Sequence, residues 1–89
     1  MKQPTYQILH TFINRYGRLQ TRVNSSIHGG TDAMARECFD QHVRFAENAW
    51  AKGRTWNRVP VRITGIVLID AAENVLAEWT HQPVKAVAA

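Results

Sequence analysis

Three arginines lie within eight positions near the N-terminus, in the stretch NRYGRLQTR: Arg15, Arg18 and Arg22. A guanidinium is a planar group of N–H donors that can bind a carboxylate or a phosphate with two hydrogen bonds. The chain carries a net charge of +4, and eight of its eleven basic residues are arginine. These arginines predict a surface for an acidic partner, either a protein or a nucleic acid. The alternative interpretation is that they form the solvated face of a hairpin.

Cys38 and His42 are the residues whose spacing comes nearest to metal chemistry, since they stand four positions apart. Two ligands do not make a zinc site, and the sequence contains no CxxC pair. Burial of Cys38 on a helix would raise the pKa of its thiol, which argues against a nucleophilic cysteine. The sequence contains no close pair of carboxylates on one element that would suggest acid–base catalysis. We therefore expect packing roles for both residues, no metal, no cofactor and no enzymatic activity.

The length of 89 residues allows one hydrophobic core, and we assign residues 1–82 to a single domain. Residues 83–89, which begin with a proline, are predicted to form a disordered tail. No apolar run approaches the roughly 18 residues of a membrane span, so no membrane contact is expected. A single cysteine suits a reducing compartment and predicts a cytoplasmic protein.

The first half of the chain predicts a hairpin. Residues 5–14 are rich in aromatic and β-branched side chains, and residues 18–27 alternate in polarity. Between them, Gly17 can adopt the positive φ that a turn requires. The alternation predicts a half-buried second strand with one apolar face: Leu19, Thr21, Val23, Ser25 and Ile27.

A long amphipathic helix is predicted over residues 32–52. Thr31 or Asp32 is suited to be its N-cap, and Gly53 is the usual residue at a C-terminus. Apolar and small residues at three- and four-residue spacing predict the buried side of this helix. They are Ala35, Cys38, Phe39, His42, Phe45, Ala46 and Ala49.

Two further strands are predicted, over residues 59–70 and 75–81. The nearly continuous apolar run of the first is typical of a central strand covered on both faces at its far end. The loop 70–74 should close a hairpin, with Asn74 as its left-handed residue. The predicted fold class is α+β, in the order ββαββ: a four-stranded antiparallel sheet with the helix on one face.

This topology brings the first hairpin turn and the loop after the helix to the same end of the molecule. Basic and aromatic side chains should gather there, and Asp32, Glu37, Asp70 and Glu73 at the opposite end. Lys52 and Arg62 are expected to belong to this cluster. The candidate partner-binding residues are Arg15, Tyr16, Arg18, Arg22, Arg54, Trp56 and Arg58.

The stretch from TDAMARECFDQHVRFAENAWAKG to ITGIVLIDAAENVLAEW spans residues 31 to 79 and joins an amphipathic helix to a hairpin. This order of elements in so small a chain resembles small phage-encoded anti-CRISPR proteins that act on type I surveillance complexes. The resemblance implies a non-enzymatic inhibitor that occupies a surface of a Cas nucleoprotein complex in the host bacterial cytoplasm. Such inhibitors share no fixed binding residues, so the candidate residues rest on the charge argument alone.

Three functions remain open from the sequence. The first is inhibition of a bacterial defence complex by steric occlusion through the basic, aromatic end. The second is direct nucleic-acid binding by the same side chains, as in a small regulatory or architectural protein. The third is a structural role as a homodimer through a sheet edge.

Overall fold

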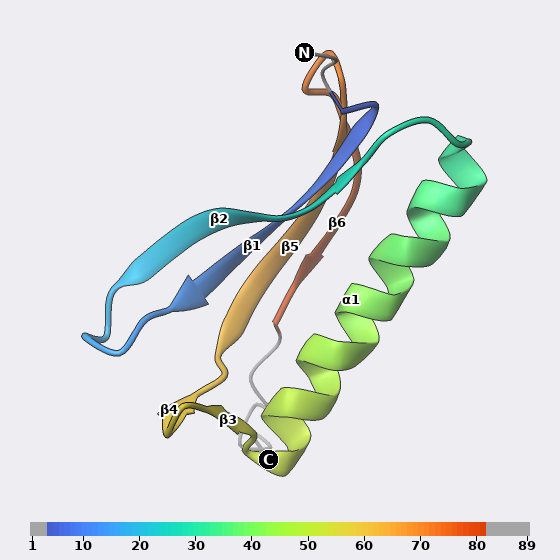
Figure 1. The fold of residues 1–89 in the computed structure, drawn as a ribbon. Helices are drawn as coiled ribbons and strands as arrows, with labels where there is room; N and C mark the ends of the chain where they lie inside the picture. The colour runs from blue at the N-terminus through green and yellow to red at the C-terminus, as the bar shows by residue number, and fades with distance from the viewer. Residues whose placement is uncertain (1–3, 82–89) are drawn as a thin grey trace, which may run out of the picture.

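The computed structural model describes residues 4–81, which form a four-stranded antiparallel sheet crossed on one face by a single long helix (Figure 1). The strand order in the sheet is β2-β1-β5-β6. The predicted α+β class with its helix on one face is confirmed, while the tail 83–89 lies outside the described residues. The elements in chain order are β1 Tyr6–Ile13, β2 Leu19–Ile27, α1 Asp32–Lys52, β3 Thr55–Trp56, β4 Val59–Pro60, β5 Ile63–Asp70 and β6 Val75–Thr80.

Helix α1 has the predicted bounds because its two ends are capped. The Thr31 side chain accepts a hydrogen bond from the Met34 backbone N–H at 3.2 Å, which satisfies one of the free amides of the first turn. Gly53 adopts the left-handed conformation, and its N–H turns back to the carbonyls of the last turn. Among the described residues, no helix is long and apolar enough to cross a membrane.

The core lies between α1 and the inner face of the sheet. Ile8, Ile66 and Leu68 are fully buried there, and the helix contributes Ala35, Phe39, Ala46 and Ala49. The small helix residues allow the helix to approach the sheet closely. The predicted buried side of α1 is wrong at Phe45, which is 50% exposed, because its half of the helix is not fully covered by the sheet.

The predicted apolar face of the second strand is also wrong. In the β1–β2 pairing, Ile8 lies opposite Ser25 but Leu9 lies opposite Val23, so a bulge at Asn24 shifts the register. A one-residue insertion reverses which residues face the core. Ser25 and Ile27 therefore point toward α1, whereas Leu19, Thr21 and Val23 point away from it. As a result, Gln20 and Arg22 occupy the helix side of the hairpin.

The segment after the helix contains a structure that the sequence analysis did not predict. Strands β3 and β4 form a small hairpin with a two-residue turn at Asn57 and Arg58, both of which have positive φ. Strand β5 consequently begins at Ile63 rather than at residue 59. The Val61 N–H donates to the Arg54 carbonyl at 2.9 Å, which ties the small hairpin to the end of the helix.

The left-handed residue of the β5–β6 loop is Glu73, with φ of 64°, and not Asn74 as predicted. The Asp70 carboxylate accepts hydrogen bonds from the backbone N–H groups of Ala72 and Asn74 and from the Asn74 amide. These bonds hold Asn74 at the start of β6, so the turn reverses one residue earlier. The same bonds, that from the Asn74 N–H first, lower the pKa of Asp70.

Candidate functional site

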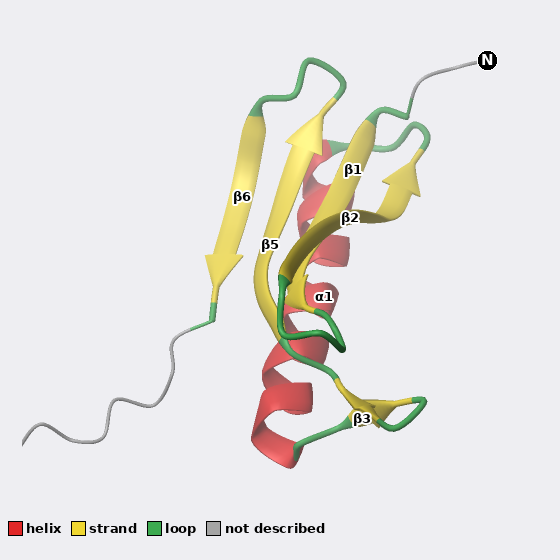
Figure 2. Cartoon of the chain, turned by 90° about the vertical axis from the view of Figure 1, so that its left-hand side faces the viewer, coloured by secondary structure: helices red, strands yellow, loops and turns green. Residues whose placement is uncertain are grey.

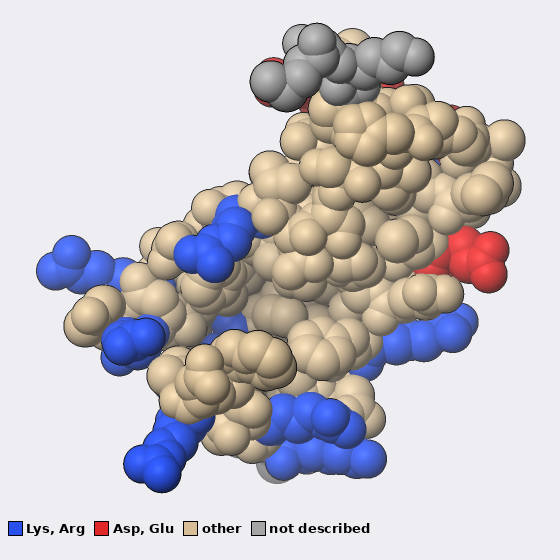
Figure 3. Space-filling view, in the orientation of Figure 1, with Lys and Arg blue, Asp and Glu red and all other residues tan. Residues whose placement is uncertain are grey.

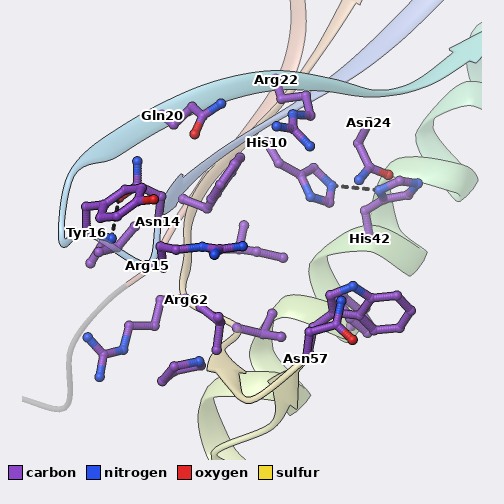
Figure 4. A pocket seen from close by; sticks show the side chains of 18 of the residues that line it. His10, Asn14, Arg15, Tyr16, Gln20, Arg22, Asn24, His42, Asn57 and Arg62 are labelled. Atoms are coloured by element: carbon purple, nitrogen blue, oxygen red, sulfur yellow. Dashed lines mark hydrogen bonds between the residues drawn. The ribbon is translucent and has the colours of Figure 1, made fainter.

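A cleft of about 770 Å³ opens between the β1–β2 hairpin, the C-terminal half of α1 and the β3–β4 hairpin (Figure 4). Register shifts interrupt the pairing of β1 with both of its neighbours, and bulges of this kind bend and twist strands. The tip of the β1–β2 hairpin therefore diverges from the helix (Figure 1). The helix end is instead held on β5, because Trp50 Nε1–H donates to the Ile63 carbonyl at 2.7 Å. The cleft lies between the diverging β1–β2 hairpin and the helix.

The walls of the cleft are largely apolar and aromatic. Phe12, Phe45 and Pro60 line it, and two large aromatic side chains stand at its opening. Tyr16 on the hairpin is 77% exposed and Trp56 on β3 is 75% exposed. Large exposed aromatic side chains are unusual on a surface that contacts only water, and they are enriched at the centres of binding interfaces.

The charge of the cleft is entirely positive. Arg15, Arg22 and Arg62 line it, and no Asp or Glu is found among the described residues around it. The guanidinium of Arg22 lies 5.7 Å from the centre of the Phe12 ring, and that of Arg15 lies 6.0 Å from the Tyr16 ring. Each arginine thus lies within cation–π distance of an aromatic ring.

The charges separate along the molecule as the topology predicted. In Figure 3 the Lys and Arg side chains gather around the tip of the β1–β2 hairpin and the end of α1, at the lower end of the view. The N-terminus of α1, with Asp32, lies at the other end together with the β5–β6 loop, which carries Asp70 and Glu73 (Figure 1). A cleft at the basic end therefore attracts acidic ligands over a distance of about one Debye length, roughly 8–10 Å.

A pair of histidines forms the inner end of the cleft. His10 Nε2 and His42 Nδ1 are 2.8 Å apart and form a hydrogen bond, and the two rings meet edge to face. His10 is 6% exposed. Burial first, and the charge of His42 second, lower the pKa of His10 to about 4; burial also lowers the pKa of His42. The pair is therefore uncharged at neutral pH, and the positive charge of the cleft comes from its arginines.

Ser25 extends this pair into a chain of polar groups, because its Oγ lies 3.3 Å from His42 Nε2. A hydroxyl, an imidazole and a third group in this order can generate a nucleophile. The Ser25–His42 distance is longer than the roughly 2.9 Å of a typical hydrogen bond, and Ser25 also lies 3.4 Å from Asn24 Oδ1. The half-buried imidazole nitrogens need hydrogen-bond partners, and this need is sufficient to explain the arrangement of Ser25, His42 and His10. The absence of enzymatic activity stays a prediction.

Four of the seven candidate residues meet at the cleft: Arg15, Tyr16, Arg22 and Trp56. Arg18, Arg54 and Arg58 are exposed at the same end of the molecule but do not line it. Arg58 lies in the β3–β4 turn, where its φ is 66°.

Arg62 was expected in the basic cluster at this end, whereas no place in the site was predicted for His10, His42 or Phe45. The position of His10 had a usable signal, because it alternates with Tyr6 and Ile8 on the face of β1 that packs on the helix. The position of Phe45 had none, since a helical pattern cannot show that the sheet stops covering one side of the helix.

Within the described part of the chain, no group of three or more His, Cys, Asp or Glu side chains lies together, and the absence of a metal stays a prediction. Comparisons with family models, with curated proteins and with solved structures give no match. The resemblance to anti-CRISPR proteins therefore stays a prediction from the sequence pattern.

Proposed function

We propose that this protein is a non-enzymatic inhibitor that binds an acidic, partly apolar surface of a bacterial defence complex through its cleft and blocks that surface sterically. The observation that supports this most is the composition of the cleft: exposed aromatic side chains and three arginines, with no carboxylate among its described lining residues. Trp, Tyr and Arg are the residue types that carry most binding free energy in protein interfaces. The defence complex itself, a Cas surveillance complex, rests on the sequence resemblance.

The electrostatics favour a partner with carboxylates. An arginine held against an aromatic ring loses less side-chain entropy on binding than a free one, and it can bind a carboxylate with two hydrogen bonds. The rings beside Arg15 and Arg22 and the apolar walls can bury the partner's hydrophobic side chains at the same time. A cleft with both properties suits a protein segment that carries acidic and apolar residues together.

The test is recovery of a partner from cells with an active CRISPR system, using the tagged protein with and without nuclease treatment. We expect a Cas protein subunit that survives nuclease, and inhibition of target-DNA binding by the purified complex. Trp56→Ala and Arg22→Glu should each weaken that inhibition at least about tenfold, because each removes or reverses a central contact. The matched control is Arg36→Glu, which makes the same charge change on exposed helix surface outside the cleft and should leave inhibition unchanged.

The second candidate function is binding of single-stranded nucleic acid, favoured by the exposure of Tyr16 and Trp56 beside the arginines. Bases can stack on exposed aromatic rings while arginines neutralise phosphates. Affinity for phosphates falls with salt by a log–log slope of roughly −0.7 per contact on single strands. If only nucleic acid is recovered, if nuclease removes it, and if its affinity falls with salt by such a slope, this second function would replace the first proposal.

A further inference from the structure

The face of the sheet that points away from α1 is defined by the strand pairing. Leu9 lies between Val23 and Val67, and it alternates along β1 with the buried residues Ile8 and His10. The same alternation assigns the remaining members of this outer face, and the side-chain hydrogen bond between Thr11 and Thr21 at 2.9 Å lies on it. The outer face comprises Gln7, Leu9, Thr11, Ile13, Leu19, Thr21, Val23, Ser26, Gly65, Val67, Ile69, Val75, Glu78 and Thr80.

This outer face is apolar and almost uncharged. Half of its residues are Leu, Ile or Val, and Glu78 on the edge strand is its one charged member among the described residues. No element of the described chain covers it, and in Figure 2 the sheet lies in front with the helix behind it. Leu19 is 69%, Val75 is 58% and Val23 is 43% exposed.

The sequence of β5 favours burial of this outer face. Val67 and Ile69 point outward and alternate with the inward residues Ile66 and Leu68, so the strand is apolar on both sides. Such a run is typical of strands buried on both faces. Within residues 4–81, α1 covers one face of this central strand only, so the described part of the chain does not supply the predicted cover on both faces at its far end.

We propose that a second copy of this protein covers the outer face, with the two sheets packed face to face about 10 Å apart. Two molecules that each carry a charge of +4 repel one another, and a two-fold contact through the outer face adds little to that repulsion, because the arginines of the cleft lie on the opposite side of the sheet. Pairing the same neutral face on both molecules gives the closed, two-fold symmetric contact that most homo-oligomers use. An acidic partner would instead be attracted to the cleft.

The area of the outer face indicates that the dimer has a low affinity. Four strands spaced about 4.8 Å apart and about eight residues long at 3.3 Å each give a footprint of about 500 Å² per copy, or about 1,000 Å² in total. That area is at the lower end for a specific protein interface. We therefore expect a dimer that dissociates in the micromolar range, between about 1 and 100 μM.

Sedimentation velocity on the full chain over a concentration series tests the proposal. We expect the weight-average mass to rise from one to two copies across the micromolar range. Leu9→Lys should weaken association at least about tenfold, because a two-fold contact contains the new charge twice. Leu9 belongs to a strand paired on both sides, so this variant leaves both sheet edges unchanged and separates face packing from edge pairing.

Val23→Lys, on an exposed part of the same face, is the second variant and should also weaken association, in case Leu9→Lys fails to fold. Met34→Lys is the matched control, since it places the same charge on an exposed apolar residue of the helix and should leave the mass unchanged. A wild-type protein that stays monomeric up to about 500 μM would overturn the proposal. So would a dimer that persists in both outer-face variants, which would assign the contact to a sheet edge or to the cleft.

Discussion

The two ends of the layer between α1 and the sheet are built differently. At the end near the β5–β6 loop, Ile8 and Leu68 from the sheet meet Ala35 and Phe39 from the helix, and every one of them is buried. At the other end, Phe45 and Trp56 remain exposed beside arginines around an open cleft. The same helix and strands thus stabilise the fold at one end and present side chains at the other. The difference arises because bulges turn the β1–β2 hairpin away from a helix that stays anchored on β5.

The largest expected effect is a difference between the two ends in how much a truncated side chain lowers the free energy of unfolding. Leu68→Ala should lower the free energy of unfolding by about 2–5 kcal/mol, because it leaves a cavity in a fully buried site. Phe45→Ala, at the open end, should cost less than about 1 kcal/mol, because half of the side chain is already in water. Urea denaturation followed by circular dichroism measures both. Equal losses would mean that the cleft is closed by packing and that the two ends do not differ.

The His10–His42 pair lies at the boundary between the two ends and should make the free energy of unfolding depend on pH. The pKa of His10 is lowered to about 4 in the folded protein, whereas it is about 6.5 in the unfolded chain. Between these values the unfolded chain binds more protons, so the free energy of unfolding should rise with pH from about 4 to 6.5 and level off above that range. Because the pair faces an open cleft, we expect a change on the order of 1–2 kcal/mol rather than the full linkage value.

Thermal unfolding of the wild type and of His10→Gln from pH 4 to 8 measures this effect. Glutamine keeps a hydrogen-bonding group without titrating, so the variant should show a shallower dependence on pH. An unchanged slope would show that other groups, such as the acidic loop residue Asp70, control stability in this range.

The smallest expected effect is at Ser25. Ser25→Ala should change the free energy of unfolding by less than about 1 kcal/mol, since its bond to His42 is long and the imidazole can be solvated from the cleft. A fluorophosphonate probe followed by mass spectrometry should leave Ser25 unlabelled in the wild type. Labelling that disappears in His42→Gln would instead identify an activated hydroxyl and an enzyme.

Local patterns were enough to predict most of the elements. The spacing of apolar residues predicts α1 with its limits, and Thr31 and Gly53 determine its caps through hydrogen bonds within a few residues. The gathering of Tyr16 and Trp56 at the basic end also follows from the order of elements, because antiparallel connections return the chain to the same end. The error at Phe45 depended on neighbours from other elements, which local patterns do not contain. The error at Asn74 arose within its own loop, where the Asp70 carboxylate accepts a hydrogen bond from the Asn74 N–H.

The sequence by itself determined the α+β class, the helix, and a positively charged end, because these depend on residue type and on contacts close along the chain. Only the tertiary structure decided which side of the β1–β2 hairpin faces the helix, since the bulge at Asn24 is a property of strand pairing. That shift places Arg22 in the cleft and turns Val23 to the outer face. The position of α1 over the sheet brings His10 and His42 together from positions 32 residues apart. One extra residue in a ladder reverses every side chain beyond it, so a pattern read along one strand cannot fix the faces of a sheet.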